Sequence, residues 1–275
     1  MCILYGEPSM KTARACKDTG DNDTGDKVDI VTVETDTVIS VDRPTSTPEV
    51  RSMFDSIAKT YDLLNFVLSC GSHRAWESKL VKSLPELPSA KCLDLCTGTG
   101  ALIPHLTKRF SSVVGLDISP QMLSIAKRKY GSWHKVSLIE ADAQNLPFAD
   151  NSFDRISIAY GIRNLPDYAK GLEEISRVLK PGGVVGILEF GQPTQWAWRY
   201  LFKFYSATVV PLLGSIISGN KHAYTYLPKT SASFPCGKRF EQKILAAGLA
   251  PIRTHKCMGG IAFIYTAQKI SEVAS

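Results

Sequence analysis

The stretch Leu93-Asp94-Leu95-Cys96-Thr97-Gly98-Thr99-Gly100 decides the fold, because it joins a short apolar run to a turn that contains two glycines. Such a run is typical of a buried strand in a parallel sheet. Glycine has no Cβ and tolerates positive φ, so the backbone of such a turn can approach a ligand closely. We therefore expect Gly98, Thr99 and Gly100 to form a ligand-binding turn, with Asp94 in the strand before it.

Two further acids end apolar runs in the same way. Asp117 follows Val113-Val114-Gly115-Leu116, and Asp142-Ala143 follows the run that ends at Glu140. A carboxylate at the tip of the second strand can accept hydrogen bonds from both hydroxyls of a ribose. A dinucleotide fingerprint would need a third glycine where the chain has Ile103, and a P-loop would need Gly-Lys-Ser/Thr. The pattern predicts a site for S-adenosylmethionine, and the alternative is an ordinary structural turn.

Strand and helix patterns alternate from Cys92 to Gly191, which indicates a parallel sheet covered on both faces. Ser119-Pro120 is a helix start, with a capping residue followed by proline at the first helical position. We expect Pro181-Gly182-Gly183 to stop one helix before a strand over 184–190. Residues 249–257 and 261–268 are expected to pair as a hairpin. The predicted fold is α/β: a Rossmann-like, class I S-adenosylmethionine-dependent methyltransferase with a seven-stranded sheet and a terminal antiparallel hairpin.

The 275 residues, 44% of them hydrophobic, suffice for one α/β domain. Residues 1–48 have no aromatic residue after Tyr5 and are expected to form a disordered arm. Residues 49–275 are the predicted methyltransferase domain, with a helical cap over 49–85 and a substrate-lid insertion over 192–235. The insertion carries a long apolar segment whose helices either form a lid or interfacial face, or simply pack onto the sheet.

Charge is distributed unevenly along the chain. Residues 1–48 hold 5 Lys/Arg and 9 Asp/Glu, so the remainder, with 27 and 17, carries a net charge of +10. This balance suits an anionic membrane surface, or else a soluble basic protein, and the absence of aromatic interleaving argues against nucleic acid. Seven irregularly spaced cysteines and an apparent lack of a signal peptide favour a reducing, cytoplasmic location. The five histidines are scattered, and we expect no metal.

Three blocks of sequence resemble the quinone-biosynthesis C-methyltransferases, the family of demethylmenaquinone and ubiquinone-menaquinone biosynthesis methyltransferases. The first is Tyr61-Asp62-Leu63-Leu64-Asn65 with Ser69, His73 and Trp76; the second is Tyr160-Gly161-Ile162-Arg163-Asn164; the third is Arg177-Val178-Leu179-Lys180-Pro181-Gly182-Gly183, which leads to Glu189. Asp142-Ala143 with Leu146-Pro147-Phe148 is similar to the adenine loop of the family. The resemblance runs from about Val50 to Lys269. Ala101 stands where an acid is common, which leaves Asp94 to steady the glycine loop.

The resemblance implies C-methylation of a reduced polyprenyl quinone. The first candidate is demethylmenaquinol to menaquinol, and 2-methoxy-6-polyprenyl-1,4-benzoquinol is a second acceptor. The alternatives are a catalytically weak cofactor-binding subunit of a biosynthetic assembly, or a methyltransferase for another acceptor. The expected partner is a membrane-borne polyprenyl quinol, with peripheral contact at the inner face of the membrane and no nucleic acid; a homo-oligomer is left open.

The resemblance also implies residue roles. Arg163 would stabilise a phenolate or polarise a water, since an arginine is a poor proton acceptor, and Asn164 would orient it. The alternative for Arg163 is a surface salt bridge. The expected cofactor-binding residues are Asp94, Gly98, Thr99, Gly100, Asp117, Asp142, Ala143, Ala159 and Tyr160. The expected substrate-binding residues are Tyr61, Asn65, His73, Trp76, Tyr205 and Tyr224, which can equally be structural.

Overall fold

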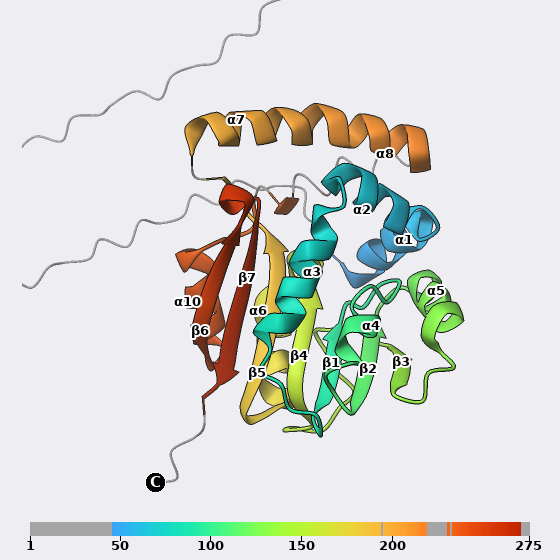
Figure 1. The fold of residues 1–275 in the computed structure, drawn as a ribbon, viewed down its shortest axis with the longest axis vertical. Coiled ribbons are helices and arrows are strands. Elements are labelled where there is room, and N and C mark those ends of the chain that lie inside the picture. The colour runs from blue at the N-terminus through green and yellow to red at the C-terminus, as the bar shows by residue number, and fades with distance from the viewer. Residues whose placement is uncertain (1–45, 194, 219–229, 232, 271–275) are drawn as a thin grey trace, which may run out of the picture. The chain divides into compact units, whose positions relative to one another are not determined.

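A seven-stranded sheet in the order β3-β2-β1-β4-β5-β7-β6 forms the centre of the computed structural model, which describes residues 46–193, 195–218, 230–231 and 233–270. All neighbours pair in parallel except β7, which runs antiparallel to both β5 and β6 (Figure 1). The predicted fold, including the terminal hairpin, is confirmed. The strands are β1 (Lys91–Leu95), β2 (Ser112–Asp117), β3 (Val136–Glu140), β4 (Phe153–Ala159), β5 (Leu179–Phe190), β6 (Leu249–Cys257) and β7 (Ala262–Lys269).

The sheet separates two hydrophobic cores, because its central strands are apolar on both faces. One core joins Leu93 and Ile156 to α6 (Tyr168–Val178) and α10 (Lys238–Ala246). The other joins Cys92 and Leu188 to α3 (Ser72–Ser83) and α4 (Ile103–Leu106). Helices therefore cover both faces, as the alternating pattern predicts.

The start of α5 (Pro120–Tyr130) confirms the predicted cap, since the Ser119 hydroxyl accepts a hydrogen bond from the Met122 amide at 3.1 Å. The predicted start of β5 is wrong. The strand begins at Leu179 and includes Pro181. Leu179 pairs with Phe153, and pairing resumes only at Val184, so the proline lies where the ladder needs no N–H donor.

Five helical segments lie at the carboxyl ends of the parallel strands, where α/β proteins bind ligands. They are α1 (Thr47–Ile57), α2 (Tyr61–Ser69), α7 (Trp196–Phe204), the π-helical segment η2 (Tyr205–Val209) and α8 (Val210–Ser218). The last three form one continuous run beside α2 (Figure 1). Helix α1 begins at Thr47, next to the predicted boundary of the arm at residue 48. Residues 1–45 of the predicted arm lie outside the described residues. Among the helices described, none is both long and apolar enough to span a bilayer.

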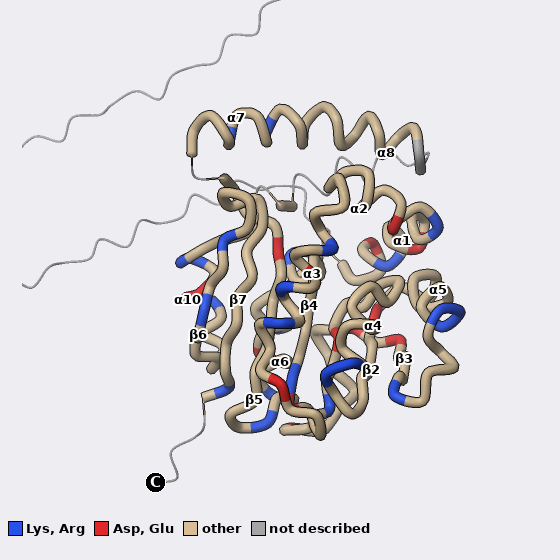
Figure 2. The backbone as a smooth tube through the Cα atoms, viewed as in Figure 1, with Lys and Arg blue, Asp and Glu red and all other residues tan. Residues whose placement is uncertain are grey.

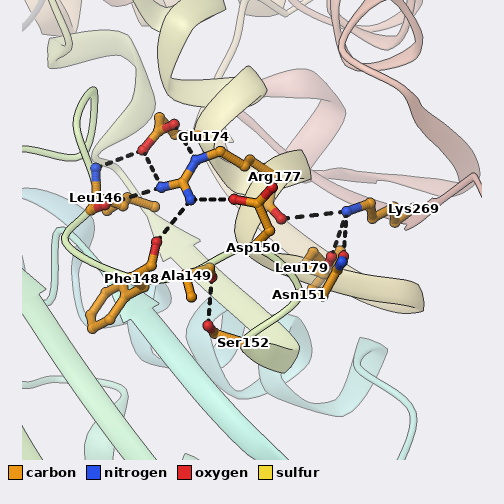
Figure 3. A network of polar contacts seen from close by, with 10 residues as sticks. All are labelled: Leu146, Phe148, Ala149, Asp150, Asn151, Ser152, Glu174, Arg177, Leu179 and Lys269. Atoms are coloured by element: carbon orange, nitrogen blue, oxygen red, sulfur yellow. Dashed lines mark hydrogen bonds and ion pairs between the residues drawn. The ribbon is translucent and has the colours of Figure 1, made fainter.

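Arg177 on α6 fixes the loop that follows β3 (Figure 3). Its guanidinium donates to the carboxylates of Glu174 and Asp150 and to the carbonyls of Leu146 and Phe148, at 2.7 to 3.0 Å. Glu174 in turn accepts from the Leu146 amide at 2.7 Å. These bonds join two of the sequence blocks quoted above and hold the chain directly after Asp142 and Ala143.

Candidate active site

A cavity that is partly open to solvent lies at the carboxyl ends of β1, β2 and β4. Of the predicted cofactor-binding residues, those that line it are Gly98, Asp117, Asp142, Ala143, Ala159 and Tyr160. Helix α1, most of which lies in the predicted helical cap, contributes Thr47, Val50 and Phe54, none of which was among the predicted site residues.

Asp117 occupies the predicted position at the tip of β2. Its carboxylate accepts hydrogen bonds from the amides of Gly98 at 2.8 Å and Ser119 at 2.9 Å. Burial raises the pKa of Asp117 to about 6, and these two amides oppose the rise. A carboxylate has about four acceptor positions, so two remain for the hydroxyls of a ribose. The geometry fits the role that the sequence predicts.

Asp94, Thr99 and Gly100, which were also predicted to bind the cofactor, are not among the residues that line the cavity. Asp94 accepts from the Thr97 hydroxyl at 2.6 Å and the Ser157 hydroxyl at 2.7 Å, and burial raises its pKa to about 6. The Thr99 hydroxyl donates to Asp62 of α2 at 2.6 Å. Gly100 has φ of +86°, and a Cβ there would lie 2.8 Å from the Tyr130 ring. The expectation that Asp94 alone steadies the loop is wrong, because Asp62 and Asp117 share that task.

The ends of β1 and β4 carry two non-glycine residues with positive φ, Cys96 at 53° and Tyr160 at 56°. Bulky residues rarely adopt this conformation, and such strain concentrates at functional sites. Both residues line the cavity. A Cβ on Gly161 would lie 2.5 Å from the Cβ of Cys96, so the two strand ends pack as closely as backbone allows.

Arg163 and Asn164 lie in the 3-10 turn η1 (Ile162–Asn164) after β4, and Asn164 lines the cavity while Arg163 is buried beside it. The Arg163 guanidinium bonds to the Glu189 carboxylate at the end of β5 and to the Tyr160 carbonyl. The alternative of a surface salt bridge is therefore wrong, since both side chains of the pair are almost fully buried. No role was predicted for Glu189, although a single acid in the apolar run 184–190 is a usable signal.

Three buried polar atoms near the cavity have no hydrogen-bond partner among the described residues. They are the Tyr160 hydroxyl, Nε of Arg163 and Oδ1 of Asn164. Buried polar groups are nearly always paired, so these unpartnered atoms, two of them on the cavity-lining residues Tyr160 and Asn164, are candidates for contact with a polar ligand. Asn164 is held by its other end, since its amide donates to the Tyr160 carbonyl at 2.9 Å.

The predicted substrate-binding residues are spread over several places. Tyr61 lines the cavity, and burial raises the pKa of its hydroxyl. A hydrogen bond with Asn65, one turn further along α2, opposes this rise. Trp76 is buried in the core behind Tyr160. The ring of His73 bonds to the Ser69 hydroxyl at 2.6 Å, at the corner between α2 and α3. Tyr205 donates to the Leu68 carbonyl. Tyr224 lies outside the described residues.

Solved structures with the same fold define the class of the protein. A possible histamine N-methyltransferase from Thermotoga maritima matches 80% of this chain and 99% of its own with a TM-score of 0.57 and 19% identity. A methyltransferase from Aquifex aeolicus that depends on S-adenosylmethionine matches 70% and 89% with a TM-score of 0.52 and 19% identity. These similarities show the class I methyltransferase fold.

Sequence comparison identifies the family. The model of the ubiE/COQ5 methyltransferase family matches residues 42–269, and the chain belongs to this family. A demethylmenaquinone methyltransferase from Staphylococcus saprophyticus is 35% identical over 224 residues, which is 80% of this chain and 96% of the relative. The protein is an S-adenosylmethionine-dependent methyltransferase, and the Asp117 carboxylate beside the glycine turn suits the ribose of that cofactor.

Proposed function

We propose that this enzyme methylates a ring carbon of a reduced polyprenyl quinone, with demethylmenaquinol converted to menaquinol as the first candidate reaction. The family and the name of the Staphylococcus relative support this choice. In the structure, the supporting observation is the set of three buried polar atoms without partners on Tyr160, Arg163 and Asn164.

The chemistry of these atoms suits a phenolic acceptor. Nε of Arg163 donates, Oδ1 of Asn164 accepts, and the Tyr160 hydroxyl does both. A hydroquinone has two oxygens that can take such partners, whereas an acceptor without hydroxyl groups leaves the buried atoms unpaired at a cost of about 1 to 3 kcal/mol each. The Tyr160 ring is stacked on Phe190 with ring centroids 4.8 Å apart, which adds a flat apolar surface next to the polar atoms.

The acceptor must become a nucleophile within this site. When bound, S-adenosylmethionine supplies an electrophilic methyl group and is left as a neutral thioether. A ring carbon attacks readily only when the oxygen beside it is ionised, and a free phenol has a pKa of about 10. We assign Arg163 to the stabilisation of this phenolate through Nε, a donor that its other contacts leave unused. The Glu189 carboxylate accepts from another nitrogen of the guanidinium and from the Arg163 backbone amide, and so helps to position the side chain.

The test is an anaerobic assay of the purified full chain with S-adenosylmethionine and short-chain demethylmenaquinone, either oxidised or chemically reduced, followed by mass spectrometry. We expect a product that carries one added methyl group only from the reduced acceptor. The reduced benzoquinol named above is run in parallel, and turnover of it alone would move the assignment to that substrate. Cofactor binding without turnover of either quinol would contradict the proposal and favour a catalytically weak subunit.

A further inference from the structure

The helical run α7–η2–α8 exposes large apolar side chains on its outward side. We call this set the outer face; its members are Trp196, Tyr200, Leu201, Phe204, Leu212 and Ile216, each between 54% and 80% exposed. Trp196, Tyr200 and Phe204 follow one another at intervals of four residues, as on one side of a helix. Exposed apolar patches of this kind mark interaction sites on proteins.

The outer face is not needed to hold the helix on the domain. Trp198 and Phe202, on the inward side, pack against the core around Tyr160. The indole N–H of Trp198 also donates to the Met258 carbonyl at 3.0 Å. Val210 packs against the hydrophobic cluster of α1 and α2. Since the inward side already anchors the run, the outward apolar residues are left for a partner.

The charged residues in the run that carries the outer face are of one sign. Residues 196–218 contain Arg199 and Lys203, both exposed, and no acidic residue (Figure 2). The neighbouring helix α2 adds exposed Leu63, Phe66 and Val67. The Arg74 guanidinium lies 5.0 Å from the centroid of the Phe66 ring. The acid of α2, Asp62, is already paired with Lys129 at 2.7 Å. A partner that matches this surface would therefore offer an apolar region to the exposed apolar side chains and negative charges to Arg199 and Lys203.

We propose that the outer face docks on an anionic lipid bilayer, with Trp196 and Tyr200 at the level of the headgroups and Arg199 and Lys203 against lipid phosphates. Aromatic residues with one polar end prefer this interface, and cations attract anionic lipids. A second copy of the chain fits less well. A two-fold contact through this helix would bring the cations of both copies together without an acid in the run to pair them.

Docking in this way places the cavity near the membrane, a consequence that rests on the proposed function. The Tyr205 hydroxyl ties the π-helical segment to the Leu68 carbonyl at the end of α2. The same helix begins with Tyr61, which lines the cavity. An acceptor that is anchored in the bilayer by a polyprenyl tail would then reach the site along the edge of α2.

The experiment is vesicle co-sedimentation of the purified full chain with phosphatidylcholine alone or mixed with phosphatidylglycerol. We expect binding to the anionic vesicles to be about tenfold tighter or more, since each cation near such a surface contributes about fivefold. The Tyr200→Ser/Phe204→Ser variant should lose at least about tenfold in affinity for anionic vesicles. The Arg199→Gln/Lys203→Gln variant should lose the preference for anionic over neutral lipid.

The matched control is Ile252→Ser, which removes a residue that is 57% exposed on β6. It should bind vesicles as the wild type does. Unchanged melting temperatures would show that the outer-face variants fold.

Wild-type protein that does not bind anionic vesicles, or an outer-face variant that binds them normally, would overturn the inference. A dimer in size-exclusion chromatography that the outer-face variant abolishes would overturn it in favour of a second copy. Methylation of a short-tailed quinol without vesicle binding would defeat only the docking inference; vesicle binding without quinol methylation would defeat only the proposed function.

Discussion

The guanidinium of Arg163 and the carboxylate of Glu189 form an ion pair that water barely reaches, at the carboxyl ends of β4 and β5. The Glu189 carboxylate also accepts from the backbone amides of Arg163 at 3.2 Å and Phe190 at 2.8 Å. Burial raises the pKa of Glu189, while Arg163 and these amides favour its charged form. Each partner thus compensates a charge that would otherwise be buried alone.

Glu189→Ala should lower the free energy of unfolding by about 3 to 5 kcal/mol, because it leaves the Arg163 charge buried and unpaired. The double variant Arg163→Met/Glu189→Ala should cost clearly less than the sum of the two single changes. Urea denaturation of all four proteins measures this coupling. Strictly additive losses would show that the pair does not stabilise the fold.

Arg163→Ala should reduce the rate of quinol methylation far more than the affinity for S-adenosylmethionine, because its role strengthens as phenolate charge develops. Arg163→Lys should restore part of the rate, since lysine keeps the charge but lacks the planar donor group. Steady-state kinetics and calorimetry on folded variants separate the two effects. Normal turnover by Arg163→Ala would exclude the phenolate role.

The positions of the strands along the chain could be predicted because each strand is an apolar run that ends in a turn signal, and those signals are local. The predicted start of β5 was wrong because one of these local signals was misleading. Pro181 resembles a helix stop, but whether a proline is tolerated in a strand depends on whether the neighbouring strand needs its N–H, and that is a property of the pairing.

The site was less predictable where partners are distant in sequence. Asp117 can be recognised by its position after an apolar run. The bonded residues Thr99 and Asp62, however, are 37 residues apart in the sequence, and Arg163 and Glu189 are 26 apart. No spacing rule connects such pairs; only the packing of α2 and β5 brings them together. The helical cap over 49–85 was predicted, but the contacts of Thr47, Val50 and Phe54 with the cavity were not, for the same reason.

Glu77→Gln should change how stability depends on pH. Glu77 on α3 is 7% exposed, and burial, with the nearby charges of Asp94 and Asp62 opposing Arg74, raises its pKa to about 7. Its stabilising contribution is therefore fully present below its unfolded pKa of about 4.5 and is lost as the pH rises through 7. Wild-type unfolding free energy should fall across this range, with up to about 3 kcal/mol due to Glu77.

The measurement for Glu77 is urea denaturation between pH 4.5 and 8.5. The unfolding free energy of Glu77→Gln should fall less steeply with rising pH than that of the wild type. Part of the fall should remain, because Asp94, Asp117 and Glu189 also have raised pKa values. Glu86→Gln, on an exposed side chain, serves as the control. Identical slopes in wild type and Glu77→Gln would refute the assignment.

Arg177→Met should weaken cofactor binding although Arg177 does not line the cavity. Its guanidinium fixes the loop after Asp142 and Ala143 through four partners, so its loss releases that loop. We expect about a tenfold or larger loss of affinity for S-adenosylmethionine. Lys269→Met, which removes bonds to Asn151 and Leu179 at the far end of the same network, should have a smaller effect (Figure 3). Equal affinities for wild type and Arg177→Met in calorimetry would contradict this role.

Asp117→Asn should both weaken the binding of S-adenosylmethionine and remove a pH dependence from it. Burial holds the pKa of Asp117 at about 6 in the protein without cofactor, and the ionised carboxylate is the stronger acceptor for ribose hydroxyls. Bound cofactor should therefore lower this pKa, so that the complex holds fewer protons than the free enzyme. Wild-type affinity should rise with pH up to about 6 and level off above it, with a slope of at most about tenfold per pH unit.

Calorimetry between pH 5 and 8 should give a weaker and flatter profile for Asp117→Asn. Asp94→Asn tells the effects of the two carboxyls apart, because Asp94 has a similar pKa but does not line the cavity. If the slope survives in Asp117→Asn and disappears in Asp94→Asn, the titrating group is Asp94, and the ribose assignment of Asp117 is wrong.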